Sequence, residues 1–157
     1  MTVHLFLILI YNTVYWRWDS RMSTSMNFDK IKILIIDDNP DINNLFKIYL
    51  ESDGCCRVDS YTNPIEALYY FKKNVYDLIL IDLKMPKIDG VAMFNALKNR
   101  DNKVIICLIT ANLSYLEHLK VKIPNIEKYV ILKPILLRNL KDKINELILE
   151  KSKIMCH

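Results

Sequence analysis

Chemically reactive side chains stand directly after four separate apolar runs of the sequence. They are an acidic pair, a third aspartate, a threonine and a lysine, in chain order Asp37, Asp38, Asp82, Thr110 and Lys133. Three carboxylates brought together would repel one another unless a cation neutralised them, and their hard oxygens suit Mg²⁺. Because Mg²⁺ in proteins keeps positions for water or phosphate oxygens, the pattern predicts a Mg²⁺ site that supports phosphoryl chemistry.

A carboxylate is also the expected nucleophile, since an aspartate that attacks phosphorus forms an acyl phosphate. The ammonium of Lys133 and the hydroxyl of Thr110 would offset the charge on the phosphoryl oxygens in the transition state. Each residue taken alone has a simpler interpretation as a turn residue, a helix cap or a solvated surface group. The combination favours chemistry, because structural turns give no reason to place all of these groups after four different runs.

The apolar runs predict the sheet that would bring these groups together. Short runs alternate with stretches of helical spacing from Lys30 onward, which is typical of βαβ units. Five short runs indicate parallel strands, at residues 31–36, 56–60, 78–81, 104–109 and 129–132, and most of them are near-continuous in Ile, Leu and Val, as strands covered on both faces are. We therefore expect an α/β fold with a doubly wound, five-stranded parallel sheet flanked by five helices. In such a sheet, chemistry collects at the carboxyl ends of the strands.

Cap residues and apolar stripes mark the helices between these strands. Pro40 falls in the first turn of one helix, and Asn63-Pro64 supplies the cap and the first residue of a helix over 65–73. The apolar stripe of the first helix consists of Ile42, Leu45, Phe46, Tyr49 and Leu50. The last helix shows a similar stripe.

The composition indicates the class of protein. With 157 residues, 52% hydrophobic and 25% charged, the chain suits one globular domain, expected over residues 29–153 between an N-terminal extension (1–28) and a tail (154–157). The net charge of +4 is dispersed among acids, so no nucleic-acid partner is expected. The four cysteines lack Cys-x-x-Cys spacing and indicate neither a zinc site nor a disulfide framework, and reduced thiols fit a cytoplasmic location.

The segment 3–16 is mostly apolar but short for a spanning helix, and the basic residues Arg17 and Arg21 follow it, unlike those of a signal peptide. Three interpretations stay open: a membrane-surface anchor, a marginal spanning helix, or translation that begins at Met22 or Met26. We favour the last, because a polar lead followed by a strand makes a self-sufficient start for a domain. Contact with a membrane is expected only if the apolar run belongs to the natural protein.

Residues 29–153 resemble the receiver domain of response regulators in two-component signalling, in a stand-alone form like that of chemotaxis regulators. The phrases that carry the resemblance are ILIIDDNPDI at 33–42, YDLILIDLKMPKIDG at 76–90, ICLITA at 106–111 and ILKPI at 131–135. The resemblance implies a flavodoxin-like fold with strand order 2-1-3-4-5 and a phosphoacceptor rather than an enzyme with an external substrate. It also implies a sensor histidine kinase or histidine phosphotransfer protein as phosphoryl donor, and a downstream target protein.

The resemblance assigns roles to the acidic residues. It implies that Asp82 accepts the phosphoryl group, and that Mg²⁺ is bound directly by Asp38, Asp82 and the backbone carbonyl of Lys84. Asp37 would orient metal-bound water. Phosphorylation of Asp82 would then switch a protein-binding surface of the domain.

The resemblance also implies phosphate contacts from the last two strands. Lys133 would pair with the phosphate, while the hydroxyl of Thr110 rotates inward and the backbone N–H of Ala111 assists. Lys84, two residues after the phosphoacceptor, would lie close enough to influence the lifetime of the phosphate. A cis peptide bond before Pro134 is usual in the family.

Tyr129 is the candidate for the aromatic switch residue that would couple to Thr110. The family pattern places this aromatic residue three positions before the lysine, where this chain has Val130. An insertion in the preceding loop or a shifted fifth strand would explain the offset. Strand alternation could also turn Tyr129 to the opposite face, which would make it an ordinary packed tyrosine.

Other functions remain to be distinguished from this one. A phosphohydrolase with an aspartyl-phosphate intermediate also uses Asp and Mg²⁺, but such enzymes carry Asp-x-Asp, and here the second residue after Asp82 is Lys84. A nucleotide- or flavin-binding sheet would need a Gly-rich loop after the first strand, whereas Gly54 and Gly90 lie elsewhere. A receiver-like scaffold that is never phosphorylated is a further alternative.

Overall fold

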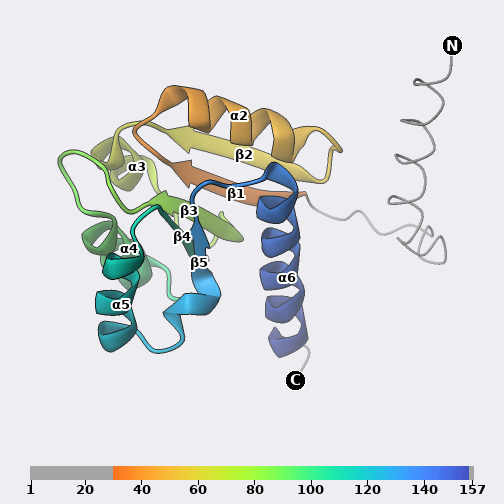
Figure 1. Ribbon diagram of the computed structural model, residues 1–157. Coiled ribbons are helices and arrows are strands. Elements are labelled where there is room, and N and C mark those ends of the chain that lie inside the picture. Colours follow the sequence, from red (N-terminus) through yellow and green to blue (C-terminus); the bar gives the residue numbers. More distant parts are fainter. Residues whose placement is uncertain (1–29, 156–157) are drawn as a thin grey trace, which may run out of the picture.

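A parallel sheet organises the part of the chain that the structure, a computed structural model, describes, which is residues 30–155. Its five strands are β1 (Ile31–Ile36), β2 (Cys56–Tyr61), β3 (Leu78–Asp82), β4 (Ile105–Thr110) and β5 (Val130–Leu132). They run parallel in the order β2-β1-β3-β4-β5 (Figure 1). The predicted strand order is confirmed.

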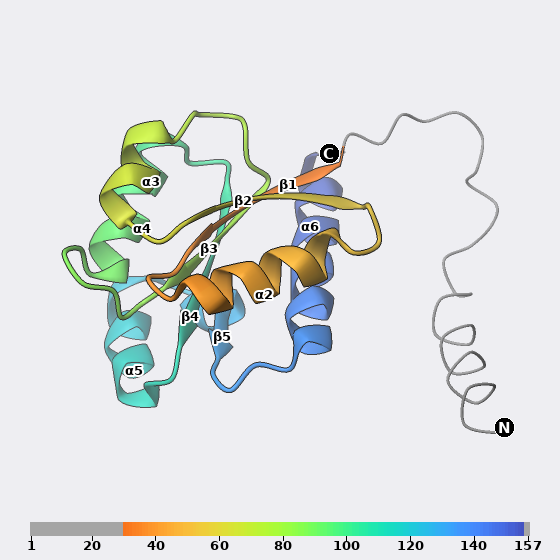
Figure 2. The same cartoon turned by 90° about the horizontal axis from the view of Figure 1, so that it is seen from above.

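Five α-helices within residues 30–155 cover both faces of the sheet; the first four connect consecutive strands and the last follows β5. They are α2 (Pro40–Glu51), α3 (Pro64–Tyr70), α4 (Gly90–Arg100), α5 (Leu113–Lys122) and α6 (Leu137–Met155), and a 3-10 turn, η2 (Ile126–Tyr129), precedes β5. The first and last of these helices, α2 and α6, pack on one face, while α3, α4 and α5 pack on the other (Figure 2). The predicted doubly wound α/β fold is therefore confirmed.

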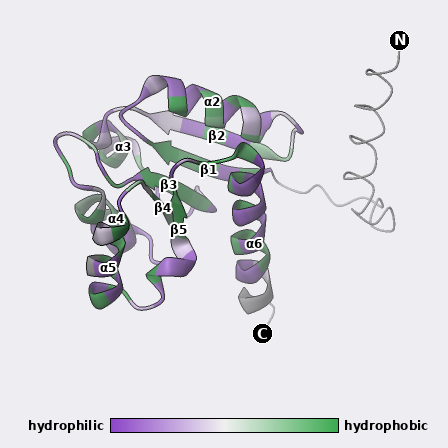
Figure 3. Cartoon of the chain, viewed as in Figure 1, coloured by the Kyte–Doolittle hydropathy of each residue, from purple (hydrophilic) through white to green (hydrophobic). Residues whose placement is uncertain are grey.

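The central strands are the most deeply buried part of the sheet. Every residue of β3 and of β4 is buried, because helices cover both faces of these strands. Figure 3 shows the same arrangement as hydrophobic colouring along the strands and mixed colouring on the outward helix surfaces. Burial on both faces is the reason that these strands appear in the sequence as continuous Ile/Leu/Val runs. The polar residues at the ends of β3 and β4 are thus anchored by the core.

Asparagine-proline pairs begin α2 and α3, as the sequence predicts. The side-chain oxygen of Asn39 accepts hydrogen bonds from two backbone N–H groups in the first turn of α2, and that of Asn63 accepts one in α3. Pro40 and Pro64 occupy the first helical positions, where a missing N–H costs nothing. The helix starts next to the carboxyl edge of the sheet are therefore fixed by local sequence.

The predicted end of the second helix is wrong by three residues. The helix expected over 65–73 ends at Tyr70, because Phe71 takes an extended conformation (φ −60°, ψ 127°). The ring of Phe71 stacks on that of Tyr76, 6.0 Å between centroids, and both pack against the core of that face. Tertiary packing overrides the local helical pattern there.

The structure tests the prediction for the C-terminal end of the chain but not those for the N-terminal end. The apolar run at 3–16 and the alternative starts at Met22 and Met26 lie outside the described residues. At the other end, α6 continues to Met155, so residues 154–155 belong to the helix rather than to the predicted tail. None of the helices between residues 30 and 155 is both long and apolar enough to cross a bilayer.

Candidate functional site

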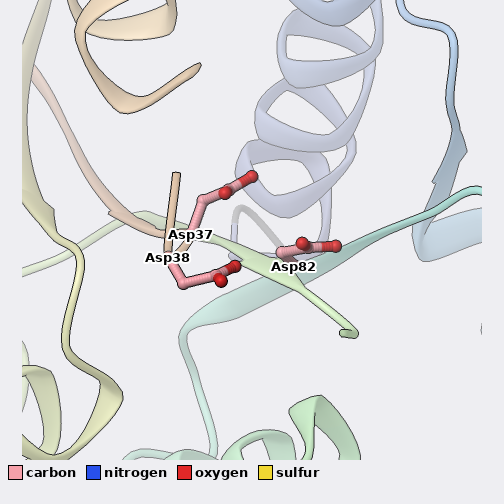
Figure 4. Close-up of side chains that lie close together, drawn as sticks. All are labelled: Asp37, Asp38 and Asp82. Carbon is pink, nitrogen blue, oxygen red and sulfur yellow. The ribbon is translucent and has the colours of Figure 1, made fainter. Parts of the chain in front are cut away.

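Three carboxylates meet at the carboxyl edge of the sheet, between β1 and β3. Asp37 and Asp38 directly follow β1, and Asp82 is the last residue of β3, which pairs with β1 in parallel. One oxygen from each of these side chains lies within 4.8 Å of the others, and Figure 4 shows the three carboxylates gathered at this edge. The structure therefore brings together the three acids that the sequence predicts for one site.

Two of the three carboxylates are buried. Asp37 is 1% exposed and Asp82 is 8% exposed, whereas Asp38 is open to solvent. Burial raises the pKa of the Asp82 carboxyl, and the negative charge of Asp37 raises it as well. Attraction to Lys133 and a hydrogen bond from the backbone N–H of Lys84 lower the same pKa without cancelling the rise. The cluster is thus short of positive charge, and its oxygen ligands fit a divalent cation such as Mg²⁺.

The ammonium of Lys133 lies against both buried carboxylates. Its Nζ is 3.3 Å from Asp82 Oδ2 and 3.4 Å from Asp37 Oδ2. The backbone N–H of Lys133 donates to the carbonyl of Thr110 at 2.8 Å, which joins the end of β5 to the end of β4. The peptide bond between Lys133 and Pro134 is cis, as the resemblance implies. The lysine therefore reaches Asp82 from two strands away and Asp37 from three strands away.

The hydroxyl of Thr110 is buried at the end of β4, beside β3 in the sheet. Its Oγ1 accepts a hydrogen bond from the backbone N–H of Asn112 at 3.0 Å. The side chain of Asn112 in turn caps α5 by accepting from the N–H of Tyr115 at 3.2 Å. Ala111, between Thr110 and Asn112, is exposed. The structure thus places both Thr110 and Ala111 at the edge of the sheet that carries the acids. The hydroxyl of Thr110 is hydrogen-bonded within its own loop.

The loop after Asp82, residues 83–89, closes tightly on itself. The N–H of Gly90 donates to the carbonyl of Leu83 at 3.2 Å, and Asp89 caps α4 through the N–H of Val91. A Cβ on Gly90 would lie 2.6 Å from the Cα of Leu83 and 2.9 Å from the carbonyl oxygen of Asp82. Only glycine permits so close a backbone approach. The position of the loop that follows Asp82 therefore depends on Gly90.

Asn43 of α2 supports the site, although the sequence analysis did not single it out. Its Nδ2 donates to the carbonyl oxygens of Asp37 at 2.8 Å and of Tyr61 at 3.2 Å, so it joins the ends of β1 and β2. Asn43 is buried, whereas Leu45, which was assigned to the apolar stripe, is 50% exposed. The spacing of three residues between Asn43 and the buried Phe46 is the sequence signal that places it on the inner face.

Tyr129 ends the turn η2, so the fifth strand begins at Val130 and not at residue 129 as predicted. In the register of β4 with β5, Val130 pairs with Leu108 and Leu132 pairs with Thr110. Val130 therefore lies on the same face of the sheet as Thr110, because side chains two residues apart share a face. The ring of Tyr129 packs against the hydrophobic clusters of both faces. Its role as a switch residue stays a prediction.

The sequence matches one family and several characterised proteins. The family model described as the response regulator receiver domain matches residues 33–145. Response regulator GtcR of Aneurinibacillus migulanus is 34% identical over 80 residues, which cover 51% of this chain and 33% of GtcR. Transcriptional regulatory protein ResD of Bacillus subtilis (strain 168) is 35% identical over 80 residues, which cover 51% of this chain and 33% of ResD. The chain thus spans about a third of the length of these curated relatives.

Solved structures agree with the family match. Response regulator TrrA of Thermotoga maritima, determined in complex with Mg²⁺-BeF, is 28% identical with a TM-score of 0.62, and the match covers 74% of this chain and 98% of TrrA. A response regulator receiver domain protein of Clostridium thermocellum is 25% identical with a TM-score of 0.66, covering 79% of this chain and 98% of that chain. With a family model that matches well over half of its residues, the chain belongs to the response regulator receiver domain family of two-component signalling.

Proposed function

We propose that this chain is the phosphoacceptor of a two-component phosphorelay, in which Asp82 takes a phosphoryl group from a phosphohistidine. A carboxylate oxygen of Asp82 forms a bond to phosphorus, the bond from phosphorus to the imidazole nitrogen breaks, and that nitrogen leaves with the electron pair. A sensor histidine kinase or a histidine phosphotransfer protein supplies the phosphohistidine. The observation that carries the proposal is the position of Asp82, a buried carboxylate beside two further acids and an ammonium 3.3 Å away.

Mg²⁺ is the cation that this site would hold. Asp38, Asp82 and the backbone carbonyl of Lys84 would bind it directly, and Asp37 would orient its water. The convergence of three carboxylates and the raised pKa of Asp82, due first to burial, support a divalent cation. Bound there, Mg²⁺ would offset the negative charge of the carboxylates and of the phosphoryl oxygens. The relative TrrA was solved with Mg²⁺-BeF, which supports the same choice of metal.

The remaining site residues would hold the phosphoryl oxygens, and the Thr110 loop would move when the phosphoryl group is bound. Lys133 would pair with one oxygen, and the hydroxyl of Thr110 and the N–H of Ala111 would turn toward another. The movement of the Thr110 loop would change the surface that a downstream target protein recognises. We propose that the chain acts in the cytoplasm, with a protein rather than a nucleic acid as its target. It catalyses only its own phosphorylation and dephosphorylation. A phosphohydrolase would need an acidic residue two positions after Asp82, and that position is occupied by Lys84, which is exposed.

Phosphoryl uptake from a small donor tests the proposed function. The purified full chain is incubated with phosphoramidate or acetyl phosphate, with Mg²⁺ or with a chelator, and its intact mass is measured. We expect a gain of one phosphoryl group that depends on Mg²⁺. Folded protein that binds Mg²⁺ but gains no mass would be a scaffold that is never phosphorylated, and the proposal would be withdrawn.

Removal of the Lys133 ammonium should slow phosphoryl uptake. We expect Lys133→Ala to lower the initial rate with acetyl phosphate by about 100-fold, because charge that develops on the phosphoryl oxygens loses a pre-positioned cation. Lys128→Ala is the matched control, since Lys128 pairs with Glu150 away from the site and its loss should leave the rate unchanged. Intact mass against time gives both rates. A Lys133→Ala rate within twofold of the wild type would exclude this role.

A further inference from the structure

The hydroxyl of Tyr115 joins the two loops that border the site. Tyr115 lies in the first turn of α5, and its hydroxyl is 2.8 Å from Asp89 Oδ1 and 2.9 Å from Asp89 Oδ2. Asp89 is the cap of α4, so the contact connects the starts of two helices that lie side by side in Figures 1 and 2. We call this hydrogen-bonded pair, Tyr115 with Asp89, the loop latch.

Hydrogen bonds donated by backbone N–H groups connect the loop latch to both sides of the site. On one side, Asp89 ends the loop that begins at Asp82 and is closed by the bond from Gly90 N–H to the Leu83 carbonyl.

On the other side, the N–H of Tyr115 donates to the side chain of Asn112, and the N–H of Asn112 donates to the hydroxyl of Thr110. A continuous set of hydrogen bonds therefore runs from the Thr110 hydroxyl through Tyr115 to the loop that follows Asp82. Movement of Thr110 toward Asp82 would have to change this set.

We propose that Tyr115 is a positioning residue whose hydroxyl holds the loops after Asp82 and Thr110 in their resting arrangement and thereby limits uptake of a phosphoryl group. This inference rests on the proposed function, because it needs Thr110 and Ala111 to reach a group on Asp82. In the resting arrangement the Thr110 hydroxyl is engaged with its own loop. The loop latch stabilises that arrangement, since a carboxylate is a strong acceptor for a phenol hydroxyl.

The surroundings of Tyr115 hold its side chain in place for the contact with Asp89. Its ring packs against the hydrophobic cluster beneath α4 and α5, so the hydroxyl is presented to Asp89 by a side chain that is already held in place. Burial, with the hydrogen bond to Asp89, raises the pKa of Tyr115 to about 12. The phenol therefore keeps its proton, and the contact its donor, throughout the physiological range.

Loss of the loop latch should favour the arrangement that binds phosphate. The apparent affinity for a ligand of the switched arrangement rises with the population of that arrangement, and a typical net hydrogen bond of about 1 kcal/mol corresponds to about fivefold in an equilibrium constant. We therefore expect Tyr115→Phe, which removes only the hydroxyl, to tighten Mg²⁺-dependent binding of beryllofluoride, a mimic of aspartyl phosphate, by about fivefold. Calorimetric titration of the full chain measures the affinity.

A second variant and a matched control separate the loop latch from general stability. Asp89→Asn keeps a good helix cap but removes the charge, and should tighten binding in the same direction. The double variant should match Tyr115→Phe alone, because without the hydroxyl the change at Asp89 removes nothing further from the loop latch. Tyr76→Phe is the control: its hydroxyl donates to Asp59 at 2.9 Å, the same chemistry away from the site, and its loss should leave the affinity unchanged.

Each result decides between a positioning role and a structural one. Tighter binding in Tyr115→Phe and Asp89→Asn, non-additive in the double variant and absent in Tyr76→Phe, supports the proposal. Unchanged or weaker binding in Tyr115→Phe, or additive effects, would overturn it. Wild-type protein that binds Mg²⁺ but no beryllofluoride would instead contradict the proposed function itself, so the two failures are distinguishable.

Discussion

Replacement of Asp82 by Asn should abolish covalent phosphoryl uptake and at the same time raise the thermal stability of the folded protein. The amide cannot form the acyl phosphate, so intact mass should show no gain. The gain in stability follows because burial raises the pKa of the Asp82 carboxyl, which means that its ionised form is unfavourable in the folded state. A stabilising effect of Asp82→Asn would fit a carboxylate that serves chemistry rather than folding.

The pH dependence of this stability difference has a definite sign. The pKa of the Asp82 carboxyl in the folded protein lies above its ordinary value of 3.8, so the wild type is at a disadvantage wherever the carboxyl is ionised. The advantage of Asp82→Asn should be full at neutral pH, should shrink as pH falls through the folded pKa, and should vanish below 3.8. Thermal unfolding followed by circular dichroism without added metal measures it at each pH.

Asp77→Asn is the matched control for Asp82→Asn. Asp77 accepts a hydrogen bond from the backbone N–H of Lys32 at the opposite edge of the sheet, so its loss should leave phosphoryl uptake intact. A phosphoryl gain by Asp82→Asn, or a neutral-pH stability below that of the wild type, would contradict the account of Asp82.

Gly90→Ala should destabilise the fold by about 3 kcal/mol or more, as expected for a forced clash in a packed core. The added Cβ would lie 2.6 Å from the Cα of Leu83 and 2.9 Å from the carbonyl oxygen of Asp82, and backbone atoms cannot turn aside as a side chain can. The higher helix propensity of alanine would stabilise this first helical position by at most about 1 kcal/mol. Because the clash costs more than that, the net effect of the substitution is destabilising. The displaced loop should also impair phosphoryl uptake by Asp82. Urea denaturation measures the stability.

Gly54→Ala shows what a glycine substitution costs without a clash. Gly54 has a φ of +74°, and nothing lies within 4 Å of an added Cβ. We expect a cost of about 1–2 kcal/mol from the left-handed conformation alone, with normal phosphoryl uptake. Equal costs at Gly54 and Gly90 would show that the close approach to Leu83 has no special role.

The sheet was predictable because buried parallel strands leave a simple signature. Each of the five runs proposed from the sequence begins and ends within one residue of a strand, and the central strands were the clearest because strands covered on both faces carry apolar side chains at most positions. The end of α3 at Tyr70 was not predictable, because it depends on the packing of Phe71 against Tyr76, which lies beyond the helix.

The acidic cluster was predictable for a topological reason. Residues that follow neighbouring parallel strands share one edge of the sheet, so Asp37, Asp38 and Asp82 had to converge once the strand order was known. Lys133 follows the same rule, with its side chain long enough to reach the acids from β5.

The supporting residues could not be predicted in the same way. Asn43 is polar on the inner face of α2, where a hydropathy pattern expects an apolar residue, and only the positions of two backbone carbonyls explain it. The contact of Tyr115 with Asp89 joins residues 26 positions apart and depends on how α4 and α5 pack. Local spacing places Asn43 on the inner face of α2 but does not reveal its carbonyl partners, and it carries no information about the contact of Tyr115 with Asp89.

The identity of the modified residue decides whether Asp82 is the phosphoacceptor. The full chain is phosphorylated with acetyl phosphate and Mg²⁺, the acyl phosphate is reduced with borohydride, and peptide mass spectrometry locates the homoserine that forms from the modified aspartate. We expect homoserine at Asp82 and at no other position. Homoserine at Asp37 or Asp38, or a phosphoryl group that resists borohydride on a different kind of residue, would contradict it.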